Sequence, residues 1–162
     1  MAIKRSPQLR PLSSEHHQAL LVAFQLKKGL AGHGESAGAP KDLPGLLALA
    51  QRFEKTVFCT HTRAEEELLG RFLRPTDMKR LKSEHGELTR LLGAAHLTRS
   101  ADTRKALTAF SDLLERHIRW EERELFPSCE DDMDEDDLVR VGHELEKRLV
   151  LSHHDGRSAK RT

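Results

Sequence analysis

Apolar residues recur every three to four positions along most of this chain, which is the spacing of one buried face on an α-helix. Glycine and proline interrupt the pattern over 32–40, at Pro75 and at Pro127, where helices are expected to end. Asp42, two residues before Pro44, is a favourable helix start because proline is tolerated in the first helical turn. The pattern therefore predicts four long helices, over about 13–30, 42–72, 76–97 and 101–127.

A shorter apolar stripe indicates a fifth helix beyond these four. The stripe consists of Leu138, Val141, Leu145 and Leu149. The acidic run over 130–137 can lie at the start of this helix, where the helix dipole favours negative charge. The fifth helix then has one face to bury, against the bundle or against a second subunit.

The ends of the chain differ in composition from the helical part. Residues 1–12 carry two prolines and several basic residues, and we expect a flexible N-terminal arm there. Residues 152–162 are polar and basic, and we expect a disordered tail. Residues 13–151 then form one domain, which contains the four-helix bundle and the C-terminal helix.

Short connections between the second, third and fourth predicted helices imply that these helices are antiparallel neighbours. The expected fold class is all-α, an up-down-up-down four-helix bundle with an additional C-terminal helix. Composition agrees with this expectation, because good helix formers dominate and aromatic residues make up only 4% of the chain.

Charge and hydropathy exclude several classes of function. The net charge is +1 with acids and bases interspersed, so nothing indicates a nucleic-acid partner. No stretch approaches the roughly 20 apolar residues that a membrane span needs. The two cysteines have no CxxC spacing, which is typical of a reducing compartment. We expect a cytoplasmic protein without a membrane or nucleic-acid partner, and the oligomeric state stays open.

Two short stretches carry the same chemical pattern, a histidine four residues before a glutamate that a second glutamate follows. One contains His61, Glu65 and Glu66, and the other contains His117, Glu121 and Glu122. Positions four apart lie on one face of a helix, so an imidazole and a carboxylate can bind the same metal ion or two adjacent ones. The second glutamates lie about 100° further round the helix, next to the site or in solvent.

Single histidines on the neighbouring predicted helices lie at about the same height in the bundle as this repeated pair. His85 is one of them. His16 and His17 compete for the other place, and His17 is favoured because His17-x-x-Leu20 matches His85-x-x-Leu88 in phase. The predicted metal ligands are therefore His17, His61, Glu65, His85, His117 and Glu121.

Each of these histidines, taken singly, would more often be a hydrogen-bonded core residue than a metal ligand. Burying so many ionisable groups at one level is costly without a partner, and a metal ion removes that cost. The remaining histidines fit no such constellation and are expected on the surface or in the tail: His33, His96, His143, His153 and His154.

These motifs resemble those of the hemerythrin-like (HHE cation-binding) domains, over about residues 13–127. The resemblance rests on Glu15-His16-His17-x-x-Leu20, His61-x-x-x-Glu65-Glu66, Glu84-His85-x-x-Leu88 and His117-x-x-x-Glu121-Glu122-x-x-Leu125-Phe126-Pro127. It implies a non-haem centre of two iron ions with an oxo or hydroxo bridge, four terminal histidines, and Glu65 and Glu121 as bridging ligands. Manganese or zinc in place of iron stays open.

The chain departs from the oxygen-carrying hemerythrins, which have a second histidine where Thr89 stands and an aspartate where Glu122 stands. It is more similar to members that sense gases, handle nitric oxide or repair iron–sulfur clusters. The function this implies is binding of, or reaction with, O₂, NO or peroxide in sensing, storage or stress response. Two alternatives stay open: an enzyme that reduces peroxide or NO or repairs iron–sulfur clusters, and an interaction bundle without metal.

Overall fold

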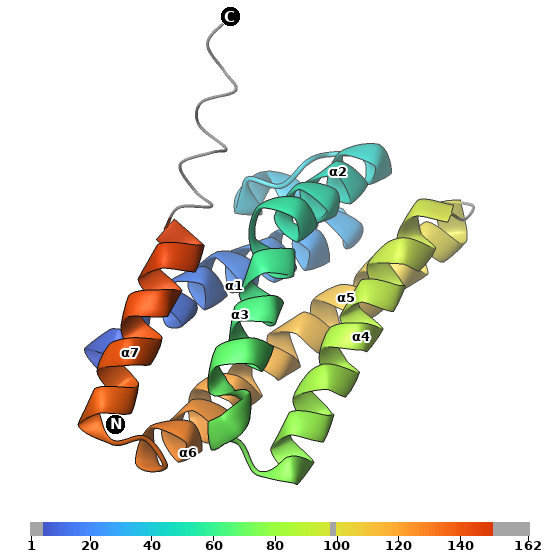
Figure 1. Cartoon of the computed structure of the whole chain (residues 1–162). Helices are drawn as coiled ribbons and strands as arrows, with labels where there is room; N and C mark the ends of the chain where they lie inside the picture. Colours follow the sequence, from blue (N-terminus) through green and yellow to red (C-terminus); the bar gives the residue numbers. More distant parts are fainter. Residues whose placement is uncertain (1–4, 98–99, 151–162) are drawn as a thin grey trace, which may run out of the picture.

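Helices make up nearly all of the computed structural model, which describes residues 5–97 and 100–150 (Figure 1). Four long helical segments run side by side and form a bundle, as the sequence predicts, and no strand occurs within the described ranges. In chain order they are α1 (Arg10–Leu30), α2 (Leu43–Phe53) with α3 (Cys59–Leu69), α4 (Pro75–Leu97), and α5 (Ser100–Trp120) with α6 (Phe126–Asp131). A further helix, α7 (Glu135–Leu145), packs on the outside of the bundle.

Short polar side chains fix where two helices begin. The Asp42 carboxylate accepts a hydrogen bond from the Gly45 N–H at 2.8 Å at the start of α2. Asp134 caps α7 in the same way, accepting from the Asp137 N–H at 2.8 Å. The acidic residues that follow Asp134 lie in the first turn of α7, where they complement the helix dipole.

Two π-helical turns interrupt the second and fourth bundle segments. One, η3 (Glu54–Phe58), joins α2 to α3, and the other, η5 (Glu121–Leu125), joins α5 to α6. A third, η6 (Glu146–Val150), ends α7, and short 3-10 turns lie at Pro7–Leu9, Gly34–Ala37 and Gly70–Phe72. A π-turn shifts every later side chain round the helix axis, so it changes which residues face the core.

The buried apolar side chains form two clusters, one towards each end of the bundle. Along α1, Leu12 belongs to one cluster and Ala19 to the other. Along α4, Leu81 and Leu88 divide in the same way. The histidines predicted to bind metal fall between these positions, so a polar layer separates the two apolar clusters.

Helix α7 covers the cluster that contains Leu9 and Trp120. Its predicted stripe faces inward, since Val141, Leu145 and Leu149 are all buried. Ion pairs at the edges join α7 and η6 to the bundle, between Arg71 and Asp137 and between Arg148 and Glu67. No helix of the described part of the chain is long and apolar enough to span a membrane.

The prediction of a flexible arm over residues 1–12 is wrong from residue 5 onward. Leu9 and Leu12 are completely buried, and α1 begins at Arg10. The apolar side chains at these two positions pack into the cluster beneath α7, which a sequence pattern cannot show. Residues 1–4 and the predicted tail over 152–162 lie outside the described residues.

The buried face of α1 also differs from the expected one. The expected phase puts Leu20 on the buried face, but Leu20 is only partly buried, and the large apolar residues Leu21 and Phe24 are 51% and 47% exposed. The core side of α1 instead carries small residues, Ala19 and Ala23. These alanines allow the backbone of α1 to approach α5 closely, and they shift the buried face by about one residue.

Candidate metal centre

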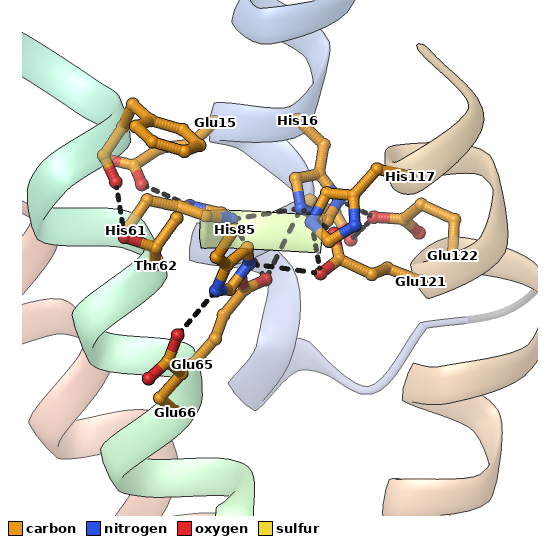
Figure 2. A network of polar contacts seen from close by, with 12 residues as sticks. Glu15, His16, His61, Thr62, Glu65, Glu66, His85, His117, Glu121 and Glu122 are labelled. Carbon is orange, nitrogen blue, oxygen red and sulfur yellow. Dashed lines mark hydrogen bonds and ion pairs between the residues drawn. The ribbon is translucent and has the colours of Figure 1, made fainter. Parts of the chain in front are cut away.

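Six ionisable side chains from four bundle segments meet in the polar layer (Figure 2). Four are histidines, one each from α1, α3, α4 and α5, and two are glutamates, from α3 and from the first position of η5. All six are buried: His16, His61, Glu65, His85, His117 and Glu121.

Helical spacing produces the two closest pairs of the group. His61 Nε2 lies 2.9 Å from Glu65 Oε1 on α3, and His117 Nε2 lies 2.9 Å from Glu121 Oε1 on the fourth segment. Both pairs are four residues apart, which is the geometry that the repeated sequence pattern predicts.

The six side chains divide into two groups that could each hold a metal ion. One group is His16, His61, Glu65 and Glu121, and the other is Glu65, His85, His117 and Glu121. In each group one ligand atom per residue lies within 4.8 Å of the others. Both glutamates belong to both groups, so the arrangement suits two adjacent cations that share two carboxylates.

Four further glutamates surround the four imidazoles and form an outer ring of carboxylates, called the carboxylate ring below. The Nδ1 atom of each imidazole lies 2.7–2.8 Å from a glutamate oxygen, in the pairs His16–Glu122, His61–Glu15, His85–Glu66 and His117–Glu84. Each glutamate comes from the helix beside the one that carries its histidine, so the ring closes around the bundle. A carboxylate that accepts from Nδ1–H leaves Nε2 free to bind a cation and fixes the plane of the ring.

Charge inside the centre shifts the pKa values of its members. Burial lowers the pKa of His85, but the carboxylates of Glu121 and Glu65 outweigh burial and raise it to about 10. For His117, burial also lowers the pKa and the Glu121 carboxylate raises it, to about 9. Burial raises the pKa of Glu65, but the imidazoles of His61, His16 and His85 together outweigh burial and hold this pKa well below its usual range.

Several ligand atoms that face the middle of the centre make no well-aligned hydrogen bond. Within the described part of the chain these are both carboxylate oxygens of Glu65, both of Glu121, and Nε2 of His85, and their nearest polar neighbours are the other imidazoles and carboxylates of the centre. Buried carboxylate oxygens in this state are costly, and a cation at the centre would satisfy all of them. Imidazole nitrogen and carboxylate oxygen are ligands that first-row metal ions accept.

The prediction that the His17 side chain lies in the centre is wrong, because the side chain found there is that of His16. His17 is exposed, whereas His16 is buried with Nε2 3.0 Å from His61 Nε2 and 3.1 Å from Glu121 Oε2. The physical reason is the phase of α1, whose core side follows Ala19 and Ala23 rather than Leu20. The other five predicted residues lie together in the centre.

Two members of the carboxylate ring, Glu15 and Glu84, were not predicted from the sequence. Each stands directly before a histidine, in the dipeptides Glu15-His16 and Glu84-His85. Consecutive residues are about 100° apart around a helix. Each of these glutamates therefore contacts a histidine of a neighbouring helix, not the histidine that follows it in the sequence. The repeated Glu-His dipeptide is the signal that could have identified them.

Outside the centre, His33, His96 and His143 are exposed as expected.

A small cavity opens beside the centre, between α1, α3 and α5. Its volume is about 20 Å³, and His16, His61, His117 and Glu121 form its polar side. The apolar part of its lining includes Ala19, Val57, Phe58 and Ile118. A space of roughly 10–15 Å³ admits one water-sized molecule, so the cavity fits a ligand of about that size.

Comparison with known proteins agrees with this geometry. The family model described as the hemerythrin HHE cation binding domain matches residues 8–129, a range that includes all six side chains of the centre and the whole carboxylate ring. No curated protein and no solved structure gives a significant match to the chain. Since the family model covers most of the chain, the chain belongs to the hemerythrin HHE cation-binding domain family.

Proposed function

We propose that this protein holds two iron ions and uses them to bind, or react with, O₂, NO or peroxide. His16 and His61 would hold one ion and His85 and His117 the other, with Glu65 and Glu121 between the two. The single observation that carries the proposal is that two metal-capable groups share both of their carboxylates. A centre for one ion would need only one of these groups.

The mixed ligand set is compatible with iron. Imidazole suits iron, zinc and copper, and carboxylate favours harder ions such as manganese and magnesium, so a mixed set suits iron. Each ion would have two imidazoles and a share of two carboxylates, which leaves positions open for an exogenous ligand. Manganese and zinc are the alternatives that metal analysis distinguishes.

The cavity beside the centre supports a small ligand. A molecule of one or two heavy atoms fits about 20 Å³ next to the buried nitrogen and oxygen atoms. Bound iron would supply the redox chemistry for such a ligand. The protein's own residues position the imidazoles through the carboxylate ring, and the apolar wall, which includes Phe58 and Ile118, limits access of water to the site.

Narrowing the cavity should slow ligand binding without removing the metal. Ala19 lines the cavity, so Ala19→Val should slow NO binding to the anaerobic ferrous protein several-fold and leave its iron content unchanged. Ala23 lies one turn further along the same buried face of α1 but does not line the cavity. Ala23→Val is therefore the matched control and should bind NO like wild type.

Stopped-flow absorption after mixing with NO, O₂ or hydrogen peroxide measures this effect and also tests the proposal. Wild-type ferrous protein should give a spectral change with at least one of the three. Absence of any change, in protein that holds two ions, would contradict the proposed function. Continued turnover with an electron donor would identify the enzymatic alternative.

The metal-dependent part of the stability should increase with pH. In the metal-free protein the raised pKa values of His85 and His117 mean that their charged pairs with glutamate stabilise the fold fully below about pH 6.5. That contribution is lost as pH rises through about 9 and about 10. Iron must displace these protons, so it competes best at high pH.

Thermal unfolding with and without iron measures this dependence. The difference in Tm should increase from about pH 6 to about pH 9. A difference that stays constant or decreases over this range would show that protons and metal do not compete at the same imidazoles.

A further inference from the structure

Arg5 lies at a buried junction between the N-terminal segment, residues 5–9, and the fourth bundle segment. Its side chain is only 8% exposed. One terminal nitrogen donates to Glu122 Oε2 at 3.0 Å and to the Glu122 carbonyl at 2.7 Å, and the other donates to Glu130 Oε2 at 3.3 Å. The guanidinium also lies over the ring of Phe126, 5.0 Å from its centre.

The backbone of η5 explains why the Glu122 carbonyl can accept from Arg5. In this π-turn the Phe126 N–H donates to the carbonyl of Glu121, five residues earlier. With the same spacing of five residues, the Glu122 carbonyl would accept from the backbone N–H of residue 127. That residue is proline, which has no N–H. Arg5 supplies the missing donor.

Two of the three side chains that Arg5 contacts in η5 and α6, Glu122 and Phe126, also contact His16. Glu122 Oε1 accepts from His16 Nδ1 at 2.7 Å and from the Ser13 hydroxyl at 2.7 Å. The Phe126 ring is stacked on the His16 imidazole, with ring centres 5.3 Å apart and planes 7° from parallel. Because Arg5 occupies Oε2 of Glu122, it leaves Oε1 facing His16.

On the His117 side of the centre, Arg80 makes contacts similar to those of Arg5, but at the surface. Arg80 donates to Glu84 Oε1 at 2.8 Å, Glu84 Oε2 accepts from His117 Nδ1, and the Arg80 guanidinium lies 4.0 Å from the ring centre of Trp120. The Arg80 side chain is 45% exposed, however, against 8% for Arg5. Exposed ion pairs are screened by water and contribute little, so the two arginines should not be equivalent.

We propose that Arg5 is a positioning residue for the metal position formed by His16 and His61, and that this position is complete only when the N-terminal segment is docked. The inference rests on the proposed metal centre. The position formed by His85 and His117 does not need Arg5, because none of the Arg5 contacts reaches the carboxylates that hold those two histidines. The two positions therefore differ in their dependence on the N-terminal segment.

Anaerobic titration of the full chain with ferrous iron tests the inference in two backgrounds. In His85→Ala, which keeps the His16–His61 position, Arg5→Ala should weaken iron binding about 10-fold, the lower end of the range for direct partners of a metal-bound histidine, because Arg5 acts through Glu122. In His61→Ala, which keeps the other position, Arg5→Ala should change the affinity less than about twofold. Arg80→Ala is the matched control and should have a small effect in both backgrounds.

A second measurement needs no ligand substitution. In the cobalt-loaded protein each of the four imidazole Nδ1–H protons should give its own paramagnetically shifted, exchangeable NMR signal. Arg5→Ala should accelerate solvent exchange of one of the four signals, that of His16, and Arg5→Lys, which keeps the charge but not the three contacts, should give an intermediate rate. Four unchanged signals, or four equally accelerated ones, would overturn the role of Arg5. Wild-type protein that binds no metal would instead contradict the proposed function.

Discussion

Replacing Glu65 with glutamine should remove both metal ions, not one. Glu65 is completely buried, belongs to both metal-capable groups, and lies within 3.5 Å of the Nε2 atoms of His16, His61 and His85. Glutamine keeps the volume but removes the charge that would face the cations. Removing one partner of a buried charged group costs about 3–5 kcal/mol, so iron affinity should fall by at least about 100-fold at both positions. Iron content after desalting and the metal-dependent part of Tm measure the loss.

Glu67→Gln is the matched control for this substitution. Glu67 is on the same helix, but its side chain is 53% exposed and pairs with Arg148 at the surface. This variant should keep both ions. If Glu65→Gln retained one tightly bound ion, Glu65 would serve a single position, and the account of a shared carboxylate would be wrong.

Substitutions in the buried face of α7 should lower the stability of the protein strongly. Leu145 is completely buried in the cluster that α7 covers, so Leu145→Ala should lower the free energy of unfolding by about 2–5 kcal/mol. Val139 is on the same helix but is 57% exposed. Val139→Ala should change stability by no more than about 0.5 kcal/mol. Chemical denaturation of the metal-free proteins measures both values.

Truncation after Asp132 is the stronger form of the same test. It removes the buried Val141, Leu145 and Leu149 and uncovers the N-terminal turn with Leu9, against which α7 packs. Burying a large apolar side chain contributes about 1.5–3 kcal/mol, so losing several such contacts approaches the total stability of a domain. A truncated protein with unchanged Tm and unchanged oligomeric state would show that α7 is not part of the folded unit.

Local spacing explains which parts of the centre could be predicted from the sequence. His61 with Glu65 and His117 with Glu121 are contacts within a helix, so helical geometry alone specifies them. The choice between His16 and His17 depends on the phase of α1. Large apolar residues usually mark the buried face, but here Leu21 and Phe24 are exposed and two alanines face the core. The close packing of α1 on α5 decides the phase, and that is a tertiary property.

The sequence places Glu66 and Glu122 beside the site, but it does not specify which histidine each glutamate of the carboxylate ring contacts. Glu15 and Glu84 bind histidines of other helices, so their partners depend on how the helices lie side by side. The π-turn η5 gives no signal in the hydrophobic pattern, although it begins at Glu121 and leaves the carbonyl of Glu122 free to accept from Arg5. Arg5 contacts residues more than 100 positions away, and the composition of residues 1–12, which predicts a flexible arm, cannot show such contacts. The four-helix bundle itself, by contrast, follows from local periodicity and short connections.

The central claim is that one chain holds two metal ions between four histidines and two glutamates. Its most direct test is the iron content of anaerobically reconstituted, desalted protein, measured together with protein concentration by amino-acid analysis. The account predicts two iron ions per chain in wild type and in His17→Ala, because His17 is exposed, and a lower content in His16→Ala. One ion per chain in wild type, or none, would contradict it, and so would a His16→Ala protein that keeps both ions while His17→Ala loses them.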